Sequence, residues 1–323
     1  MALVADEVWE RLDVSHWVVR GVEQAGSSRN LWLAEPGTGH EWLHKDTVIP
    51  GNGIEQGEDW AEVVSTQVSL LLGAPCATTR LCVRQDRRGS ISRSVRPDGH
   101  SLNEGNVVLQ RASAPGYFPH GEGDPAIDPS RPLVRRPGHS LANVRLALEG
   151  VVGPPGFRAP EPRIGFDAFA GYMILDALVA NRDRHEQNWA VLTPQLISPP
   201  ERLSPSYDHA SSLGFNLTEP RREICLREPV RMRAWAEKGT AYRFEHIGTP
   251  PTLVQHAARA VGMCSRTGAD WWCGQLMALE LDSVLEPLRE RAVPGMSDLA
   301  ARFAHNLLTL NLGRLRDEIR QCA

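Results

Sequence analysis

A short polar cluster follows the most apolar segment of the chain. It holds Asp183, Arg184, His185 and Asn188, between a predicted buried helix and a further apolar run. Polar groups beside a core each need a partner, so the cluster is either a hydrogen-bond hub or a site. A carboxylate such as Asp183 can orient a hydroxyl group and accept its proton, and the oxygen of Asn188 can bind a metal ion. Helix capping and loop closure by Asp and Asn are the ordinary alternative.

A second carboxylate, Asp208, lies twenty residues after Asn188. Pro205 and Tyr207 precede it at the end of a connection that can form a hairpin. Mg²⁺ bound to nucleotide phosphates keeps several waters and takes few protein side chains, so one amide and one carboxylate suit it. We therefore predict Asn188 and Asp208 to be Mg²⁺ ligands in a nucleotide site.

Only two of the 35 basic residues are lysines, and Lys45 lies on a predicted strand. An ammonium group is a compact charge that fits against phosphate oxygens where a planar guanidinium does not. Glu62, near the start of the next predicted helix, is the candidate partner of Lys45, with Glu58 and Asp59 as alternatives one turn earlier. An exposed strand lysine without function is the ordinary alternative.

A small, donor-rich turn, Ala25 to Asn30, separates two predicted strands. Its backbone and hydroxyl groups can fold over phosphates, so Ser27 and Ser28 are candidate phosphate contacts. Simple turn formation by these serines is the alternative.

The elements that position these residues fall into two groups. In the first group, the sequence predicts three antiparallel strands and then a helix that ends at Gly73. Two more strands follow, separated by a charged segment. In order, these are residues 14–24, 28–35, 41–49, 58–72, 76–85 and 106–111, with the charged segment at 87–105. After a Pro- and Gly-rich stretch with a short helix at 140–150, apolar residues at helical spacing predict a helix over 166–178, buried along one side. Residues 217–323 are expected to be helical.

Composition excludes several classes of protein. With 323 residues, 41% hydrophobic and 23% charged positions, the chain is expected to fold around a sizeable core, as one large domain or two lobes. No apolar run is long enough for a membrane span and the start of the chain is acidic, so we expect a cytoplasmic protein. The net charge of -4 gives no general attraction to nucleic acid, and six cysteines without a CxxC pair suggest neither zinc nor disulfides.

The run DALVANRDRHEQNWAVL, followed by SPSYDHASSLG, resembles the HipA-like kinases. These are serine/threonine kinases of bacterial toxin–antitoxin pairs that share a catalytic core with phosphoinositide kinases. The five-residue spacing of Asp183 and Asn188 is also that of kinase catalytic loops. The resemblance is specific from Phe166 to Phe215 and looser back to Gly21.

The resemblance implies an α+β, two-lobed protein-kinase-like fold. A small antiparallel-sheet N-lobe would span residues 1–111 and a mainly helical C-lobe residues 112–323, with ATP between them. Asp183 would be the catalytic base, Asn188 and Asp208 the Mg²⁺ ligands, Lys45 the phosphate-binding lysine and Glu62 its partner. A hinge at Gln110 to Ala112 would hold the adenine through backbone groups of Gln110 and Ala112, and Ser27 or Ser28 would be sites of autophosphorylation.

The implied function is transfer of the γ-phosphoryl group of ATP to a hydroxyl, the Ser or Thr of a protein. Two alternatives are a kinase for a small molecule or peptide natural product and a nucleotide-binding pseudokinase. An antitoxin-like partner receives less support, because only about a dozen residues precede the first predicted strand, where toxin kinases carry a further subdomain. DNA binding is expected only through such a partner.

Overall fold

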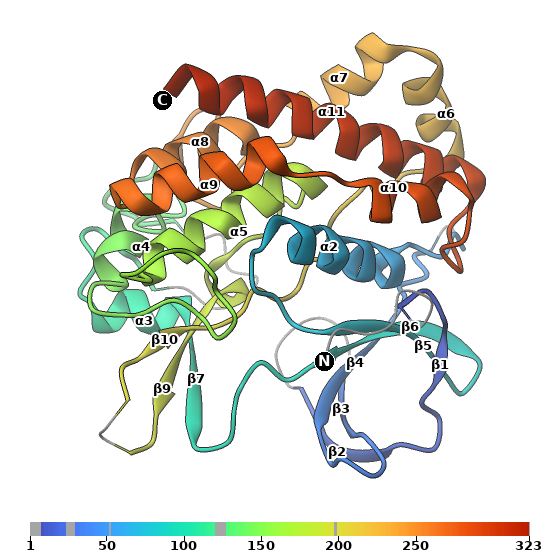
Figure 1. The fold of residues 1–323 in the computed structure, drawn as a ribbon, viewed down its shortest axis with the longest axis horizontal. Helices are drawn as coiled ribbons and strands as arrows, with labels where there is room; N and C mark the ends of the chain where they lie inside the picture. The colour runs from blue at the N-terminus through green and yellow to red at the C-terminus, as the bar shows by residue number, and fades with distance from the viewer. Residues whose placement is uncertain (1–7, 24–29, 52, 120–126, 197–198, 323) are drawn as a thin grey trace.

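The computed structural model describes residues 8–23, 30–51, 53–119, 127–196 and 199–322. Two sheets lie along one side of the molecule, and most helices gather above them (Figure 1). The N-terminal part supplies the larger sheet with α2, Glu58–Leu72, and the C-terminal part is mainly helical. A small antiparallel-sheet lobe with a helical lobe is the predicted architecture, and it is confirmed.

The larger sheet has six strands in the order β1-β5-β6-β4-β3-β2 over the described residues. Its pairs are antiparallel except β1 with β5. The three strands predicted first are β2, β3 and β4, and the predicted helix is α2, which ends at Gly73 with a φ of +79° as glycine readily allows. The strands span Leu12–Asp13 (β1), Val18–Val22 (β2), Leu31–Ala34 (β3), Glu41–Asp46 (β4), Thr79–Arg84 (β5) and Arg87–Arg93 (β6).

Two predictions between residues 87 and 111 are wrong. The segment expected as a charged loop contains β6 and β7, His100–Glu104. β6 lies between β4 and β5, and a Cβ on Gly89 would lie 2.3 Å from the carbonyl oxygen of Lys45, so this glycine permits the close pairing. The segment expected as a strand is helix α3, Gly105–Arg111, whose buried Gly105, Val108 and Leu109 follow helical spacing.

The second sheet belongs with the helical part of the molecule. It has three antiparallel strands in the order β10-β9-β7, with β9 at Ala190–Pro194 and β10 at Arg202–Leu203. β9 and β10 form the hairpin expected between Asn188 and Asp208. Because β7 already pairs with β9, the connection between the two sheets is residues 94–99, upstream of the predicted hinge.

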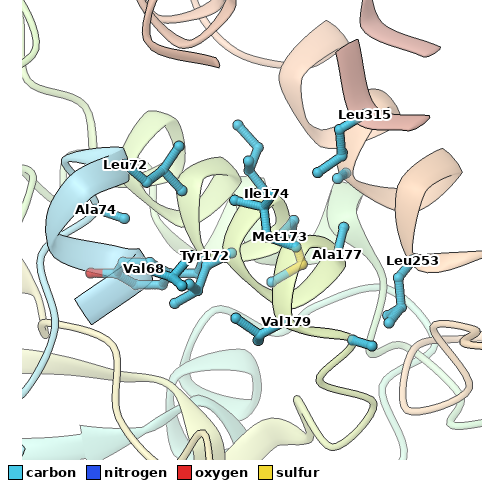
Figure 2. Close-up of a cluster of buried hydrophobic side chains, with 14 of the residues drawn as sticks. Val68, Leu72, Ala74, Tyr172, Met173, Ile174, Ala177, Val179, Leu253 and Leu315 are labelled. Carbon is cyan, nitrogen blue, oxygen red and sulfur yellow. The ribbon is translucent and has the colours of Figure 1, made fainter. Parts of the chain in front are cut away.

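Helix α5, Gly165–Val179, runs through the centre of the helical part (Figure 1). The sequence pattern indicated one buried side, but all fifteen residues are buried, because α2, α8, α9 and α11 pack around it. Figure 2 shows this packing around side chains of α5, α2 and their neighbours. They are Tyr172, Met173, Ile174, Ala177 and Val179 with Val68, Leu72, Ala74, Leu253 and Leu315. The polar cluster at residues 183–188 follows shortly after the end of this buried helix.

The remaining helices lie where helices were predicted, one within residues 140–150 and the others within residues 217–323. They are α4 at Leu141–Ala147, α6 at Glu219–Arg227, α7 at Pro229–Glu237, α8 at Leu253–Gly262, α9 at Arg266–Ala278, α10 at Asp282–Arg289 and α11 at Asp298–Cys322. A two-stranded ribbon, β8 at Val134–Arg135 with β11 at His246–Ile247, joins distant segments. No helix within the described residues is both long and apolar enough to cross a membrane.

Candidate active site

A cavity of about 880 Å³ lies between the two sheets. It is lined by strands of the larger sheet, by residues 94–96, by β7 and by the loops at 183–188 and 207–210. Four predicted site residues, Lys45, Asp183, Asn188 and Asp208, line it together. A cavity of this size can enclose most of a nucleotide.

Lys45 and Asp208 form an ion pair inside the cavity. The Nζ atom of Lys45 lies 2.9 Å from Oδ1 of Asp208. Burial opposes the charged form of Lys45, but the carboxylates of Asp208 and Glu62 outweigh it and raise the pKa of Lys45. Burial likewise opposes the charge of Asp208, but Lys45 outweighs it and lowers the pKa of Asp208. Both groups therefore stay ionised at neutral pH.

Asp208 also has an unusual backbone conformation. Its φ is +59°, a left-handed value that a residue other than glycine adopts at a cost of about 1 kcal/mol. Strain of this kind persists where the surroundings impose it, often at functional sites. Here the main-chain N–H of the next residue, His209, donates to a buried carboxylate, which fixes the turn.

That carboxylate belongs to Glu62, whose predicted pairing with Lys45 needs correction. Oε2 of Glu62 accepts the N–H of His209 at 2.7 Å, and Oε1 lies 3.3 Å from Nδ1 of His209. Within the described residues, Lys45 forms its ion pair with Asp208 and not with Glu62. The charge of Glu62 still raises the pKa of Lys45, so Glu62 ties α2 to the Asp208 turn and acts on Lys45 through space.

The two alternative partners of Lys45 are engaged elsewhere. Asp59 is buried and accepts a hydrogen bond from Arg11 at 2.5 Å. Oε2 of Glu58 lies 3.4 Å from the N–H of Val48, which donates to it. Glu58 does line the cavity, but no ion pair with Lys45 involves it among the described residues.

Asp183 and Asn188 are held to one another across their loop. Nδ2 of Asn188 donates to the main-chain oxygen of Asp183 at 2.7 Å, and the N–H of Asp183 donates to Oδ1 of Asn181 at 3.0 Å. The side chain of Asp183 accepts from Nε of Arg243 at 2.7 Å. Because Nδ2 of Asn188 is committed to the loop, its Oδ1 is the atom left to bind a ligand.

A buried ion pair anchors this loop to α5. Arg184 donates from Nε and Nη2 to the two carboxylate oxygens of Asp176 at 2.9 and 2.7 Å, and from Nη1 to the oxygen of Asn188 at 2.7 Å. Burial opposes the charge of Arg184, but Asp176 outweighs it and raises the pKa of Arg184. The sequence prediction missed Asp176, although an acidic residue in the last turn of a largely apolar helix was a usable signal.

Two further groups of predicted site residues remain, the two serines and the hinge residues. Ser27 and Ser28 fall outside the described residues. Gln110 and Ala112 do not line the cavity; Gln110 is in the last turn of α3 and the N–H of Ala112 donates to Val108. Residues 94–96 with Ser101 and Leu102 line the cavity, whereas adenine binding by Gln110 and Ala112 stays a prediction.

The donor set fits Mg²⁺ bound to a nucleotide. No group of three or more His, Cys, Asp or Glu that could hold a metal ion occurs among the described residues. Asn188 and Asp208 both offer oxygen atoms to the same cavity, and Lys45 offers a cation beside them. Mg²⁺ in a nucleotide site binds few protein oxygens and completes its coordination with water and phosphate oxygens.

Comparison with solved structures identifies the fold. The crystal structure of the Helicobacter pylori proinflammatory kinase CtkA matches with a TM-score of 0.70 and 13% identity, covering 97% of this chain and 98% of that one. HipA of Shewanella oneidensis MR-1, solved with HipB and operator DNA, matches with a TM-score of 0.51 and 12% identity, covering 94% and 68%. No protein-family model matches the chain, and no curated protein matches its sequence. The chain therefore has a HipA-like kinase fold.

Proposed function

We propose that the chain is an ATP- and Mg²⁺-dependent phosphotransferase of the HipA-like kinase type. It transfers the γ-phosphoryl group of ATP to a hydroxyl group, that of a Ser or Thr of a protein. One observation carries the proposal: Lys45, Asp183, Asn188 and Asp208 come from distant segments and converge on one cavity between the sheets. A kinase fold with CtkA and HipA as structural neighbours supports it.

Each residue has a role in the reaction. The acceptor oxygen forms a bond to the γ-phosphorus, the bond from that phosphorus to the β–γ bridging oxygen breaks, and ADP leaves. Asp183 orients the hydroxyl and accepts its proton. Lys45 offsets phosphate charge with its ammonium group, and Asn188 and Asp208 would hold the metal ion. Mg²⁺, when bound, neutralises charge that develops on the phosphate oxygens.

Turnover of an Asp183→Asn variant tests the assignment. Purified protein is incubated with Mg²⁺ and radiolabelled ATP, and ADP release and self-labelling are measured. We expect loss of about 10²- to 10⁴-fold in turnover, as for removal of a general base, with an ATP-dependent rise in melting temperature retained. Asp270→Asn, on the exposed surface of α9, is the matched control.

The outcome separates the open alternatives. Wild-type turnover in Asp183→Asn would remove Asp183 from the mechanism. An ATP-dependent rise in melting temperature of the wild type without any ADP release would identify a nucleotide-binding pseudokinase. Transfer to a small molecule or peptide natural product, and to no protein, would replace the protein acceptor.

A further inference from the structure

The two residues proposed to hold the metal ion lie on opposite sides of the β9–β10 hairpin, beyond its paired strands. Asn188 precedes β9, and Asp208 follows β10. Among the described residues, the last backbone hydrogen bond between the two sides of this hairpin runs from the N–H of Ser204 to the oxygen of Ala190, at 2.8 Å. The main-chain ladder therefore stops before it reaches either metal ligand.

After this bond the chain turns away from β9. Pro205 has no N–H with which to continue the ladder. The N–H of Ser206 donates to the oxygen of Pro75 at 2.9 Å, and the N–H of Ala77 donates to the oxygen of Ser206 at 2.8 Å. The segment that carries Asp208 is thus paired with residues that follow α2, and main-chain pairing with β9 does not set its distance from Asn188.

The side chain of Tyr207 bridges this gap. Its hydroxyl donates to the main-chain oxygen of Gln187 at 2.8 Å. Tyr207 directly precedes Asp208, and Gln187 directly precedes Asn188, so this hydrogen bond joins the neighbours of both metal ligands. All four residues line the nucleotide cavity. The bond lies at the site, where it can fix how the two ligands stand relative to one another.

Arg184 makes a second connection across the gap, and it is the longer one. Its Nη1 donates to the main-chain oxygen of Asn188 at 2.7 Å but reaches the main-chain oxygen of Tyr207 only at 3.4 Å. A hydrogen bond of that length is weak. The Tyr207 hydroxyl is therefore the shorter of these two connections between the ligand-bearing segments.

The main chain at Asp208 needs support from both sides. Its left-handed φ of +59° persists only where the surroundings impose it. On one side the N–H of His209 donates to Glu62. On the other side Tyr207 is held by its hydroxyl. With that hydroxyl removed, the turn would keep only the support from Glu62 and the long contact from Arg184.

We propose that Tyr207 is a positioning residue that holds Asn188 and Asp208 so that both can bind the same Mg²⁺ ion. Mg²⁺ demands near-ideal octahedral geometry, so its affinity falls when two of its ligands shift relative to one another. Groups that orient metal ligands through hydrogen bonds change metal affinity about 10- to 100-fold when they are removed. The inference rests on the proposed function, because it concerns the metal ligands of that same site.

Removal of the hydroxyl tests this role with metal binding as the readout. Binding of the non-hydrolysable ATP analogue AMP-PNP to the full chain is measured by isothermal titration calorimetry, over a series of Mg²⁺ concentrations and in EDTA. In Tyr207→Phe we expect the Mg²⁺ concentration that gives half of the gain in affinity to rise about tenfold. The affinity in EDTA should match that of the wild type, because the variant keeps the ring that lines the cavity.

Tyr172→Phe is the matched control. The hydroxyl of Tyr172 donates to the main-chain oxygen of Ser204 at 2.8 Å, so this variant also loses one hydrogen bond to a carbonyl oxygen, before the gap begins. It should keep the wild-type dependence on Mg²⁺. In an Asp208→Asn background, Tyr207→Phe should change the Mg²⁺ dependence less than about twofold, because the carboxylate that it positions has been removed.

The outcomes separate the inference from the proposed function. An unchanged Mg²⁺ dependence in Tyr207→Phe, the same shift in Tyr172→Phe, or the full shift in the Asp208→Asn background would overturn the inference. Equal losses of affinity with Mg²⁺ and in EDTA would also overturn it and would assign Tyr207 to the nucleotide. The expected shift without any ADP release would count against the proposed function alone, and a wild type that binds AMP-PNP equally with and without Mg²⁺ would count against both.

Discussion

Lys45 and Asp208 meet across 163 positions of the chain, and their contact shows how two ionised groups share a cavity. Residue type, spacing and the family resemblance singled out Lys45, Asp183, Asn188 and Asp208, and these four residues line one cavity. Arg243 was missed. Its partner lies sixty positions away, and no local pattern distinguishes it from 32 other arginines.

The Lys45–Asp208 contact should appear as a coupling energy. In a double-mutant cycle with Lys45→Met and Asp208→Asn, unfolded by urea at neutral pH without Mg²⁺, we expect about 1 kcal/mol, because both side chains are about a third exposed. Added salt should reduce it. A coupling energy of zero at low salt would contradict the pairing in solution.

Arg243 should act as a positioning residue for Asp183. Replacing it by Gln removes the Nε hydrogen bond and the ion pair to Oδ1 of Asp183, so we expect kcat to fall about tenfold or more. The KM for ATP should stay the same, since Arg243 does not line the cavity. Arg243→Lys keeps one charged donor and should recover part of the loss. A raised KM for ATP with normal kcat would point to a different role.

Buried histidines should make the protein sensitive to acid. Burial lowers the pKa of His256 to about 3, against about 6.5 in an unfolded chain. Between these values the unfolded state binds a proton that the folded state excludes, so His256 contributes stability above pH 6.5 that is lost as the pH falls toward 3.

Urea unfolding of His256→Gln at several pH values below 6.5 measures this contribution. The decline of the unfolding free energy with falling pH should be shallower than in the wild type by up to about 1.4 kcal/mol per pH unit. His139, whose pKa burial also lowers, remains and keeps part of the decline. Identical slopes would show that His256 does not stay neutral in the folded protein.

At the scale of elements, the spacing of apolar residues predicted the long helices. It failed for segments whose conformation is set by backbone pairing with neighbouring strands. α2 and α5 have apolar positions at helical spacing, and a glycine or an apolar run marks their limits. β6 is polar, and its strand conformation comes from ladders with β4 and β5 on both sides, which composition does not reveal. α3 has only seven residues and contains two valines, so strand preference misled the prediction.

The anchor between α5 and the catalytic loop should be costly to break. Asp176→Ala leaves Arg184 buried without its carboxylate, so we expect a loss of about 3–5 kcal/mol in unfolding free energy by urea titration. Glu237→Ala, which breaks the exposed pair with Arg233 on α7, is the control and should cost less than about 1 kcal/mol. Equal losses in the two variants would argue against the anchoring role.

For the whole molecule, the two-lobed arrangement followed from the family resemblance, but the position of the connection did not. Pairing of β7 with β9 assigns β7 to the second sheet, and this contact spans about ninety positions of the chain. A sequence pattern cannot show which of two sheets a strand joins. The two sheets are connected by residues 94–99, whereas the sequence prediction put a hinge at residues 110–112.

Nucleotide binding should protect both lobes at once. Hydrogen exchange with ATP and Mg²⁺ is expected to slow in segments 41–46, 94–104, 183–188 and 207–210, which line one cavity. Segment 266–278, the distant α9, should exchange as before. Protection restricted to one lobe would exclude a site shared by both.

The contrast between the enclosed α5 and the solvent-facing Arg182 has an evolutionary consequence. A substitution along α5 disturbs packing against neighbours on every side. We therefore expect α5 to change in evolution only together with compensating substitutions in those neighbours. Arg182 stacks on one aromatic ring, and its replacement leaves that interior untouched. Single substitutions are therefore expected to be tolerated at Arg182 far more often than along α5.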